Sequence, residues 1–233
     1  MTSVFSLIEK RHSVRSFRPH RLSLKEEAKI QDLLKSPLVA GLDQRLDWKL
    51  KLNTPVGSGK LYTIVPDRRP EVLVAYGFQG QNLLLKLVAL GYGTCWLGVG
   101  RAMEKNSPAV IVFGYEGPPN LVAWASRIFL RPGQRRPLAS LLSEASLKPS
   151  SNLLKVLHAM RLAPSAVNRQ PWRFTVKGDY KLEVRRTGGH PVWSYLDLGI
   201  VLCHGYLASQ EVFGDAEVER INTDTYQLVM AKP

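Results

Sequence analysis

The 233-residue sequence contains little cysteine and no long apolar run. Its two cysteines, Cys95 and Cys203, lie in apolar stretches, and neither belongs to the Cys-x-x-Cys or Cys/His spacing of a zinc site. We therefore expect no metal, no disulfide framework and a reducing, cytoplasmic location. No stretch approaches the roughly 20 apolar residues of a membrane span, and the N-terminal residues lack the apolar segment of a signal peptide, so we expect no membrane partner.

Acidic residues are scarce relative to basic ones. The chain has 19 Asp and Glu residues against 32 Lys and Arg residues, which gives a formal net charge of +13. Such an excess is common in nucleic-acid binders, but here the basic residues form small separate groups, and the aromatic-basic motif of RNA-recognition sheets is absent. We therefore expect no nucleic-acid partner. The groups either form a solvated surface or include ligands for phosphate, which suits the planar donor fork of arginine.

The remaining composition is that of an ordinary globular protein. Hydrophobic residues make up 45% of the chain and charged residues 22%, and the length suffices for a large core. We expect a single domain over residues 1–233. A division into two halves, 1–145 and 150–233, is the alternative, because the region between them is the best candidate for a linker.

Apolar periodicity predicts five helices. They are residues 3–10, 23–36, 70–90, 151–162 and 193–212. Segments 70–90 and 193–212 are apolar almost all round, which predicts that they are buried together. Their likeness is compatible with an internal duplication, although two independently buried helices would look alike through composition alone.

Strand signals are weaker and fewer. Residues 42–52 alternate in part, and residues 109–115 are a short β-branched apolar run typical of a buried strand. Residues 173–176 and 181–185 have the pattern of paired strands around a Gly-Asp turn. Residues 53–60 have turn chemistry.

Three stretches carry residues suited to ligand binding. The first is Arg-His-Ser-Val-Arg at residues 11–15. In an extended segment alternate side chains share a side, so Arg11, Ser13 and Arg15 would present two guanidinium groups around a hydroxyl, which suits a phosphate monoester. The same pattern is also common on solvated surfaces.

The second stretch is Ala-Pro-Ser-Ala-Val-Asn-Arg-Gln-Pro-Trp at residues 163–172. Two prolines bracket a loop between a helix and a strand, and Ser165, Asn168 and Gln170 offer hydroxyl and amide groups. Amides both donate and accept, which suits a heterocycle with mixed edges. The alternative is a loop that is hydrogen-bonded to itself.

The third stretch is Leu-Gly-Tyr-Gly-Thr-Cys-Trp-Leu-Gly at residues 90–98. Glycines at the exit of a buried helix allow close backbone approach to a neighbour. The stretch lacks the Gly-x-Gly-x-x-Gly pattern at a strand-to-helix turn, so a dinucleotide-binding fold is a poor match. A helix cap followed by a core strand would give the same pattern.

Together these stretches resemble the nitroreductase-like flavoprotein family, and the resemblance covers most of the chain. It extends to Pro-Ala-Val-Ile-Val-Phe-Gly-Tyr at residues 108–115 and Arg-Arg-Pro-Leu at residues 135–138. It implies an α+β, three-layer fold with a mainly antiparallel central sheet and buried apolar helices.

One feature departs from the ordinary family pattern. The Pro-Ser-Asn loop ordinarily follows the Arg-Ser-Arg motif closely, whereas here it comes last of the three stretches, as in a divergent branch of nitroreductases. In ordinary members this loop reaches the flavin of the partner subunit. The resemblance therefore implies a homodimer, and the displaced loop leaves open a monomer in which the loop reaches a flavin of its own subunit.

The resemblance also implies an FMN site. Arg11, Ser13 and Arg15, with His12 beside them, would bind the phosphate and ribityl chain, and Arg135 or Arg136 would add a further phosphate contact. The remaining expected contacts lie along the flavin ring and its reactive edge. They are Leu97, Gly98, Pro164, Ser165, Asn168 and Gln170.

The implied activity is hydride transfer from NADH or NADPH through bound FMN to a nitroaromatic, a quinone or a related electron-poor acceptor. The flavin carries this chemistry, so no catalytic side chain is expected. The alternative is a protein that binds or stores flavin without efficient turnover. His158 and His204 lie on apolar helices, and we expect them in the core or at an interface.

Overall fold

The computed structural model describes residues 2–35, 38–119 and 134–232. In the first half of the chain two short helices precede two strands, a long helix and two further strands. These elements are α1 (Val4–Lys10), α2 (Leu24–Lys35), β1 (Lys49–Leu52), β2 (Gly59–Tyr62), α3 (Pro70–Ala89), β3 (Gly93–Leu97) and β4 (Val110–Gly114).

The second half repeats this order. Its elements are α5 (Leu138–Leu141), α6 (Ser151–Arg161), the 3-10 turn η1 (Ala166–Asn168), β5 (Trp172–Gly178), β6 (Lys181–Arg186), α7 (Trp193–Phe213), β7 (Ala216–Asn222) and β8 (Thr225–Met230). The two sheets also have the same strand order, β1-β2-β4-β3 and β5-β6-β8-β7, and every pairing is antiparallel.

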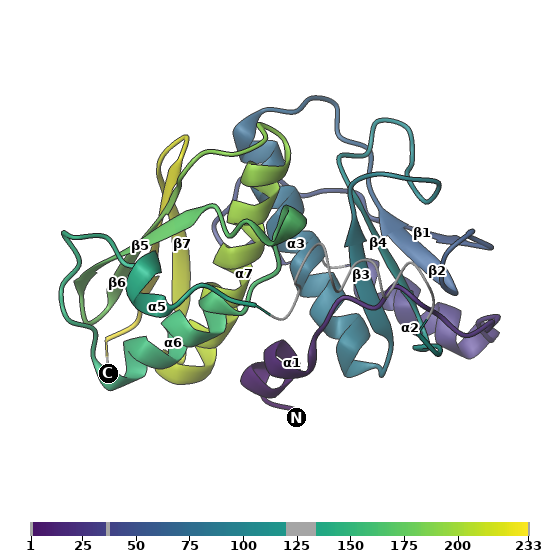
Figure 1. Cartoon of the computed structure of the whole chain (residues 1–233), viewed down its shortest axis with the longest axis horizontal. Coiled ribbons are helices and arrows are strands. Elements are labelled where there is room, and N and C mark those ends of the chain that lie inside the picture. The colour runs from purple at the N-terminus through teal and green to yellow at the C-terminus, as the bar shows by residue number, and fades with distance from the viewer. Residues whose placement is uncertain (1, 36–37, 120–133, 233) are drawn as a thin grey trace.

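Helices α3 and α7 lie side by side between the two sheets (Figure 1). The molecule therefore has three layers, a sheet, a helix pair and a second sheet. The predicted α+β class with antiparallel strands is confirmed, as is the burial of the two apolar helices against each other. The strands are divided between two outer sheets, where a central sheet was expected, because each half builds its own sheet on its own long helix.

Two glycines allow α3 and α7 to approach closely. A Cβ atom on Gly77 would collide with the carbonyl oxygen of Leu196, and a Cβ on Gly199 would collide with the carbonyl oxygen of Val74. Leu196 lies three residues before Gly199 on α7, and Val74 lies three residues before Gly77 on α3. The contact is thus reciprocal, as at a two-fold axis, and it relates residue 77 of α3 to residue 199 of α7.

The loops that follow α2 and α6 repeat an unusual conformation. Ala40 and Gly41 have φ of +42° and +79°, and Val167 and Asn168 have φ of +46° and +57°. Each loop also closes with a backbone hydrogen bond across three residues. This bond runs from Leu42 N to Val39 O in the first loop and from Arg169 N to Ala166 O in the second. The described structure therefore consists of two equivalent halves, which favours duplication over the likeness of two unrelated buried helices.

The predicted helix boundaries agree with the structure to within two residues. Ser23 and Glu26 form a reciprocal cap at the start of α2, with Ser23 N donating to Glu26 and Glu26 N donating to Ser23 Oγ. Pro70 occupies the first turn of α3, where its missing N–H is not needed, and Gly91 with φ of +91° ends that helix.

The strand predictions were less complete. Of the segment 42–52 only Lys49–Leu52 is a strand, and β2 begins inside the stretch that was interpreted as a turn. Strands β7 and β8 were not predicted. One hydrophobic cluster includes residues of both halves.

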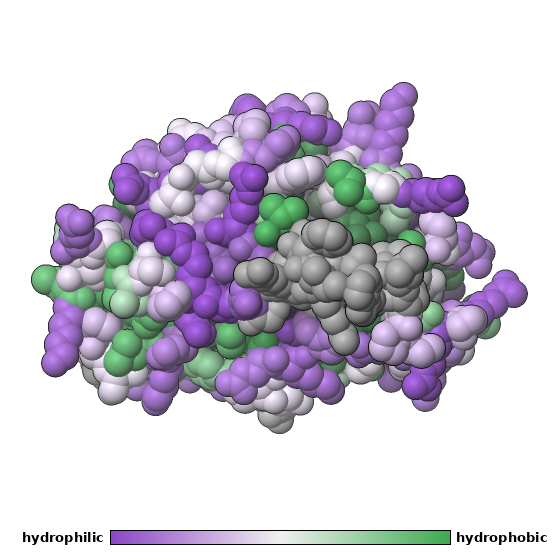
Figure 2. Space-filling model, in the orientation of Figure 1, coloured by the Kyte–Doolittle hydropathy of each residue, from purple (hydrophilic) through white to green (hydrophobic). Residues whose placement is uncertain are grey.

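Hydrophilic residues predominate on the face that Figure 2 shows, and apolar residues occur there in groups between them. Among the helices within the described ranges, none is long and apolar enough to cross a membrane.

Gly77→Ala and Gly199→Ala are each expected to destabilise the protein. In an ordinary helix interior, Gly→Ala stabilises by about 0.5–1 kcal/mol, so the close approach of the helices must reverse the sign. The midpoint of guanidinium chloride unfolding measures the effect. A raised midpoint in either variant would show that the helices are not held together through these two positions.

Candidate functional site

The three stretches meet at one cavity of about 230 Å³ between the two halves. The first half contributes an N-terminal arm and the end of β3, and the second half contributes the loop before η1 and the start of α7. The lining residues are Ser13, Arg15, Trp96, Leu97, Gly98, Val99, Ala109, Pro164, Ser165, Ala166, Val167, Trp193, Leu196, Asp197 and Ile200. We call this the ring cavity, because two indoles and aliphatic side chains form much of its wall.

The N-terminal arm is placed by pairing with β3. Ser13 forms a parallel bridge with Thr94, and Val14 N donates to the Thr94 carbonyl at 2.9 Å. Val14 is 2% exposed, whereas Ser13 and Arg15 line the cavity. The expected alternation therefore holds for these three residues, since the apolar one faces the interior and its neighbours face the ligand space.

Arg11 is buried without a carboxylate. It is 8% exposed, and its Nε has no hydrogen-bond partner among the described residues. Burial, followed by the nearby charges of Arg135 and Arg15, lowers the pKa of Arg11 to about 10, so the side chain is still charged at neutral pH. Two guanidinium groups of the arm, those of Arg11 and Arg15, thus lie close to that of Arg135 from the second half.

A small polar extension continues from the ring cavity towards these arginines. Its lining includes Ser13, Arg15, Arg135, Ser165 and Asn168. Of these residues, Ser13, Arg15 and Ser165 also line the ring cavity. The combined space is apolar at one end and cationic at the other. Such a space suits a molecule that has a flat ring at one end and an anionic group at the other.

The displaced loop is held by hydrogen bonds at both ends. Ser165 Oγ accepts from Gln170 N at 2.9 Å, and Asp197 Oδ1 accepts from Ala166 N at 2.9 Å. Between them Val167 has φ of +46°, a strained conformation for a β-branched residue, and it is exposed. The loop is therefore fixed in a costly shape that brings Pro164 and Ser165 to the cavity.

The amide side chains of the loop bind mainly to protein. Asn168 Nδ2 donates to Gln134 O and its Oδ1 accepts from Arg135, each at 2.8 Å. Gln170 is buried, and its Oε1 accepts from Arg136 N at 2.9 Å. The structure therefore places Arg135 and Asn168 at the polar extension, while Gln170 and Arg136 support the loop from behind and are not among the lining residues.

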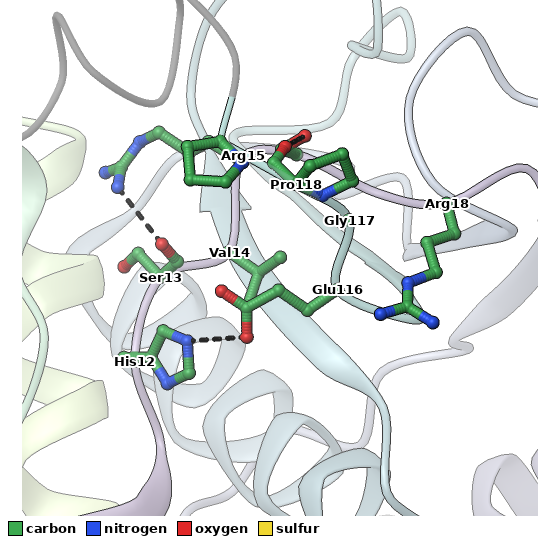
Figure 3. Close-up of a pocket in the computed structure, with 10 residues that line it drawn as sticks. His12, Ser13, Val14, Arg15, Arg18, Glu116, Gly117 and Pro118 are labelled. Carbon is green, nitrogen blue, oxygen red and sulfur yellow. Dashed lines mark hydrogen bonds and ion pairs between the residues drawn. The ribbon is translucent and has the colours of Figure 1, made fainter.

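His12 faces a different cavity. Figure 3 shows its ring directed at Glu116, with 3.1 Å between Nε2 and the carboxylate, while Arg15 lies beside Ser13. This second cavity, of about 590 Å³, borders the ring cavity at Ser13 and Arg15. The structure thus does not bring His12 to the loop of the second half, because alternation turns its side chain the opposite way.

Several residues that line the ring cavity were not among the site residues predicted from the sequence. Trp96, Trp193, Asp197 and Ile200 are among them. Asp197 had a usable signal, since it is a lone acid within the apolar run at residues 195–203. Trp193 packs so closely that a Cβ on Gly98 would lie 3.0 Å from its indole Nε1, which explains the glycine there.

A chain of hydrogen bonds fixes the Trp96 wall and joins the halves. Trp96 Nε1 donates to Gln81 Oε1 at 3.0 Å, and Gln81 Nε2 lies 2.9 Å from Nε2 of His204. Nδ1 of His204 in turn lies 2.9 Å from the Ala159 carbonyl. Burial lowers the pKa of His204 to about 3, so this histidine is a neutral core residue as expected, whereas His158 is exposed.

No group of three or more potential metal ligands occurs within the described ranges. Both cysteines are buried and unpaired. The ring cavity and its polar extension offer a ligand arginine side chains, backbone and aromatic walls.

Solved structures are similar to this chain. A crystal structure of a "putative nitroreductase" from Thermotoga maritima superposes with a TM-score of 0.80 and 32% sequence identity, covering 98% of this chain and 94% of that one. A "putative nitroreductase in complex with FMN" from Desulfovibrio desulfuricans has 19% identity over 64% of this chain and 99% of its own, with a TM-score of 0.44. No curated protein matches the sequence.

The paired sheets, the central helices and the cavity between them define a nitroreductase-like α+β protein. The chain belongs to the nitroreductase family described as "Putative TM nitroreductase", whose model matches residues 3–209.

Asn168→Ala is expected to lower the stability of the flavin-free protein. The change removes hydrogen bonds to Gln134 and to a charged arginine, so a loss of about 1.5–3 kcal/mol in unfolding free energy is expected. Thermal unfolding measures it, with the exposed Asn152→Ala on α6 as control. An unchanged apoprotein with weakened flavin binding would show that Asn168 acts on the ligand alone.

Proposed function

We propose that the protein is an FMN-dependent oxidoreductase that passes hydride from NADH or NADPH, through bound FMN, to a nitroaromatic, quinone or related electron-poor acceptor. The observation that carries this proposal is the buried charge of Arg11, which no described carboxylate offsets, close to Arg15 at the cationic end of a cavity that has aromatic and aliphatic walls. Membership of the nitroreductase family supports the same class of reaction.

The charge balance favours an anionic ligand. Burying a guanidinium without a counter-charge is costly, and two further arginines close by increase that cost. A phosphate monoester would offset it, because its oxygens match the planar donor fork of arginine and make strong charge-assisted hydrogen bonds. Arg15 and Arg135 line the polar extension and are the residues that would hold the phosphate, with Arg11 behind them.

The aromatic end fits a flavin ring. Trp96 and Trp193 supply flat walls, and the backbone at Leu97 and Gly98 lines the same space. Bound FMN would supply the hydride chemistry, and the chain's own residues would bind its phosphate, orient its ring and exclude water from part of the cavity. Ser13 and Ser165 lie where the two spaces join, which suits contacts to the ribityl hydroxyls.

One chain supplies both sides of the proposed site. Ser13 and Arg15 come from the first half, and Pro164 and Ser165 come from the second, so no second subunit is needed to complete it. The repeated fold defines an equivalent position on the other side of the helix pair, and that position is closed. There a Cβ on Gly41 would lie 2.6 Å from the Val218 carbonyl, and Arg220 pairs with Glu71 at 3.7 Å.

We therefore propose a single domain over residues 1–233 that works as a monomer with one FMN. The correspondence of α3 with α7 aligns Glu71 with Trp193. The correspondence of β3 with β7 aligns Leu97 with Arg220. An ion pair thus stands where the open site has an aromatic wall.

The buried free cysteines accord with the proposed cytoplasmic location.

Arg15→Ala is expected to weaken FMN binding by roughly tenfold to a hundredfold, the worth of one charge-assisted hydrogen bond. Riboflavin, which lacks the phosphate, should bind the variant as it binds the wild-type protein. Quenching of flavin fluorescence measures both affinities. Arg21→Ala, at an exposed position of the same arm, is the control. Equal losses for FMN and riboflavin would contradict a phosphate role for Arg15.

A monomeric site should bind FMN with the same dissociation constant at all protein concentrations. Light scattering combined with flavin titration checks this, with an expected stoichiometry of one FMN per chain. Affinity that falls as the protein is diluted below its dimerisation range would instead support the homodimer.

Turnover separates the oxidoreductase from a flavin-storage protein, which is the second candidate. Adding NADPH or NADH anaerobically to the FMN-loaded protein should bleach the flavin absorption, and a quinone should restore it. An FMN-loaded protein that neither nucleotide bleaches would support storage.

A further inference from the structure

A buried carboxyl stands in the ring cavity without a role so far. Asp197 lies on the second turn of α7, is 4% exposed and lines the cavity together with Trp193 and Ile200. Its Oδ1 accepts a hydrogen bond from Ala166 N at 2.9 Å. No described residue forms a hydrogen bond with Oδ2, so half of the carboxyl is left for whatever occupies the cavity.

The first half of the fold has no carboxyl at the equivalent position of its long helix. Because residue 77 corresponds to residue 199, Asp197 corresponds to Ala75 of α3, which is fully buried. The loop beside that helix has the same pair of positive φ angles, at Ala40 and Gly41, with no acid to hold it. An alanine therefore suffices at this position of the helix pair, and the acid has to be explained by the cavity.

Resting on the proposed function, we propose that the Asp197 carboxyl binds the flavin ring in this cavity by donating a hydrogen bond from Oδ2 to an acceptor atom of the ring. A flavin ring carries carbonyl oxygens and ring nitrogens that accept hydrogen bonds, and the amide of Ala166 keeps the carboxyl turned in a fixed direction. Asp197 is thus a ligand-binding residue at the ring end, as Arg15 is at the phosphate end.

The surroundings keep the carboxyl neutral, as a donor must be. Burial raises the pKa of Asp197 to about 8, against the opposing effect of the hydrogen bond from Ala166. Among the described residues that line the cavity, Arg15 is the only other one with a charged side chain. Nothing described near Asp197 therefore stabilises the carboxylate by an ion pair.

Flavin affinity as a function of pH tests the inference, with FMN and riboflavin as separate probes. For the wild-type protein both ligands should bind roughly tenfold more weakly at pH 9 than at pH 7, because the ionised carboxyl loses its donor. Asp197→Asn keeps a donor that does not titrate and should abolish this dependence. Asp197→Ala should weaken both ligands at pH 7 by about threefold to tenfold.

The controls separate this inference from the proposed function. Asp179→Asn, at the exposed β5–β6 turn, should leave the wild-type pH profile unchanged. Identical profiles for the wild-type protein and Asp197→Asn, or unaltered affinity in Asp197→Ala, would overturn the role of Asp197 alone. Failure of the wild-type protein to bind either flavin would overturn the proposed function as well.

The flavin-free protein offers a second readout. A carboxyl that stays protonated in the folded state but ionises in the unfolded chain favours unfolding as pH rises from about 4 to about 8. Asp197→Asn removes this effect, so the variant should gain stability relative to the wild type across that window. A constant difference between pH 4 and pH 8 in the denaturation midpoints would show that the carboxyl is not held neutral, and the inference would fail.

Discussion

The close approach of α3 and α7 determines where every other part of the site can lie. At Gly77 and Gly199 each helix packs against the carbonyl backbone of the other, so no side chain larger than hydrogen fits between them. Because the contact is reciprocal, it places the end of β3 from one half next to the loop before η1 from the other. A site that draws on both halves is therefore a consequence of helix packing, and the hydrogen-bond chain from Trp96 through Gln81 to His204 strengthens the same junction.

Equivalent halves do not produce equivalent sites. The fold relates the open cavity to a position at which Arg220 and Glu71 form an ion pair and Gly41 packs directly against β7. The basic arm with Ser13 and Arg15 belongs to the first half alone. Once a single chain contains both halves, only one of two related sites has to be kept, and the other can be filled to join the halves.

The sequence allowed the long elements and the ligand-binding stretches to be predicted, because both depend on local patterns. Helices α3 and α7 are apolar almost all round, and the arm, the loop and the end of β3 each show unusual local chemistry. What depended on distant contacts was missed. The short strand β2 owes its place to pairing with β4, His12 turns to Glu116 more than a hundred residues away, and Asp197 acquires its meaning only beside Ala166.

Two energetically unfavourable features of the second half, the positive φ of Val167 and the buried carboxyl of Asp197, lie at the cavity. The equivalent positions of the first half allow each feature to be compared. Val167 is strained at a positive φ, where the equivalent residue is Ala40 and is followed by a glycine. Asp197 is a buried acid, where the equivalent residue is Ala75. Strain of this kind costs about 1–3 kcal/mol, and an unsatisfied buried polar group costs a similar amount. The positive φ recurs at Ala40 and so belongs to the architecture, whereas the buried acid has no counterpart in the first half. A ligand in the cavity is the simplest reason for the chain to retain that acid.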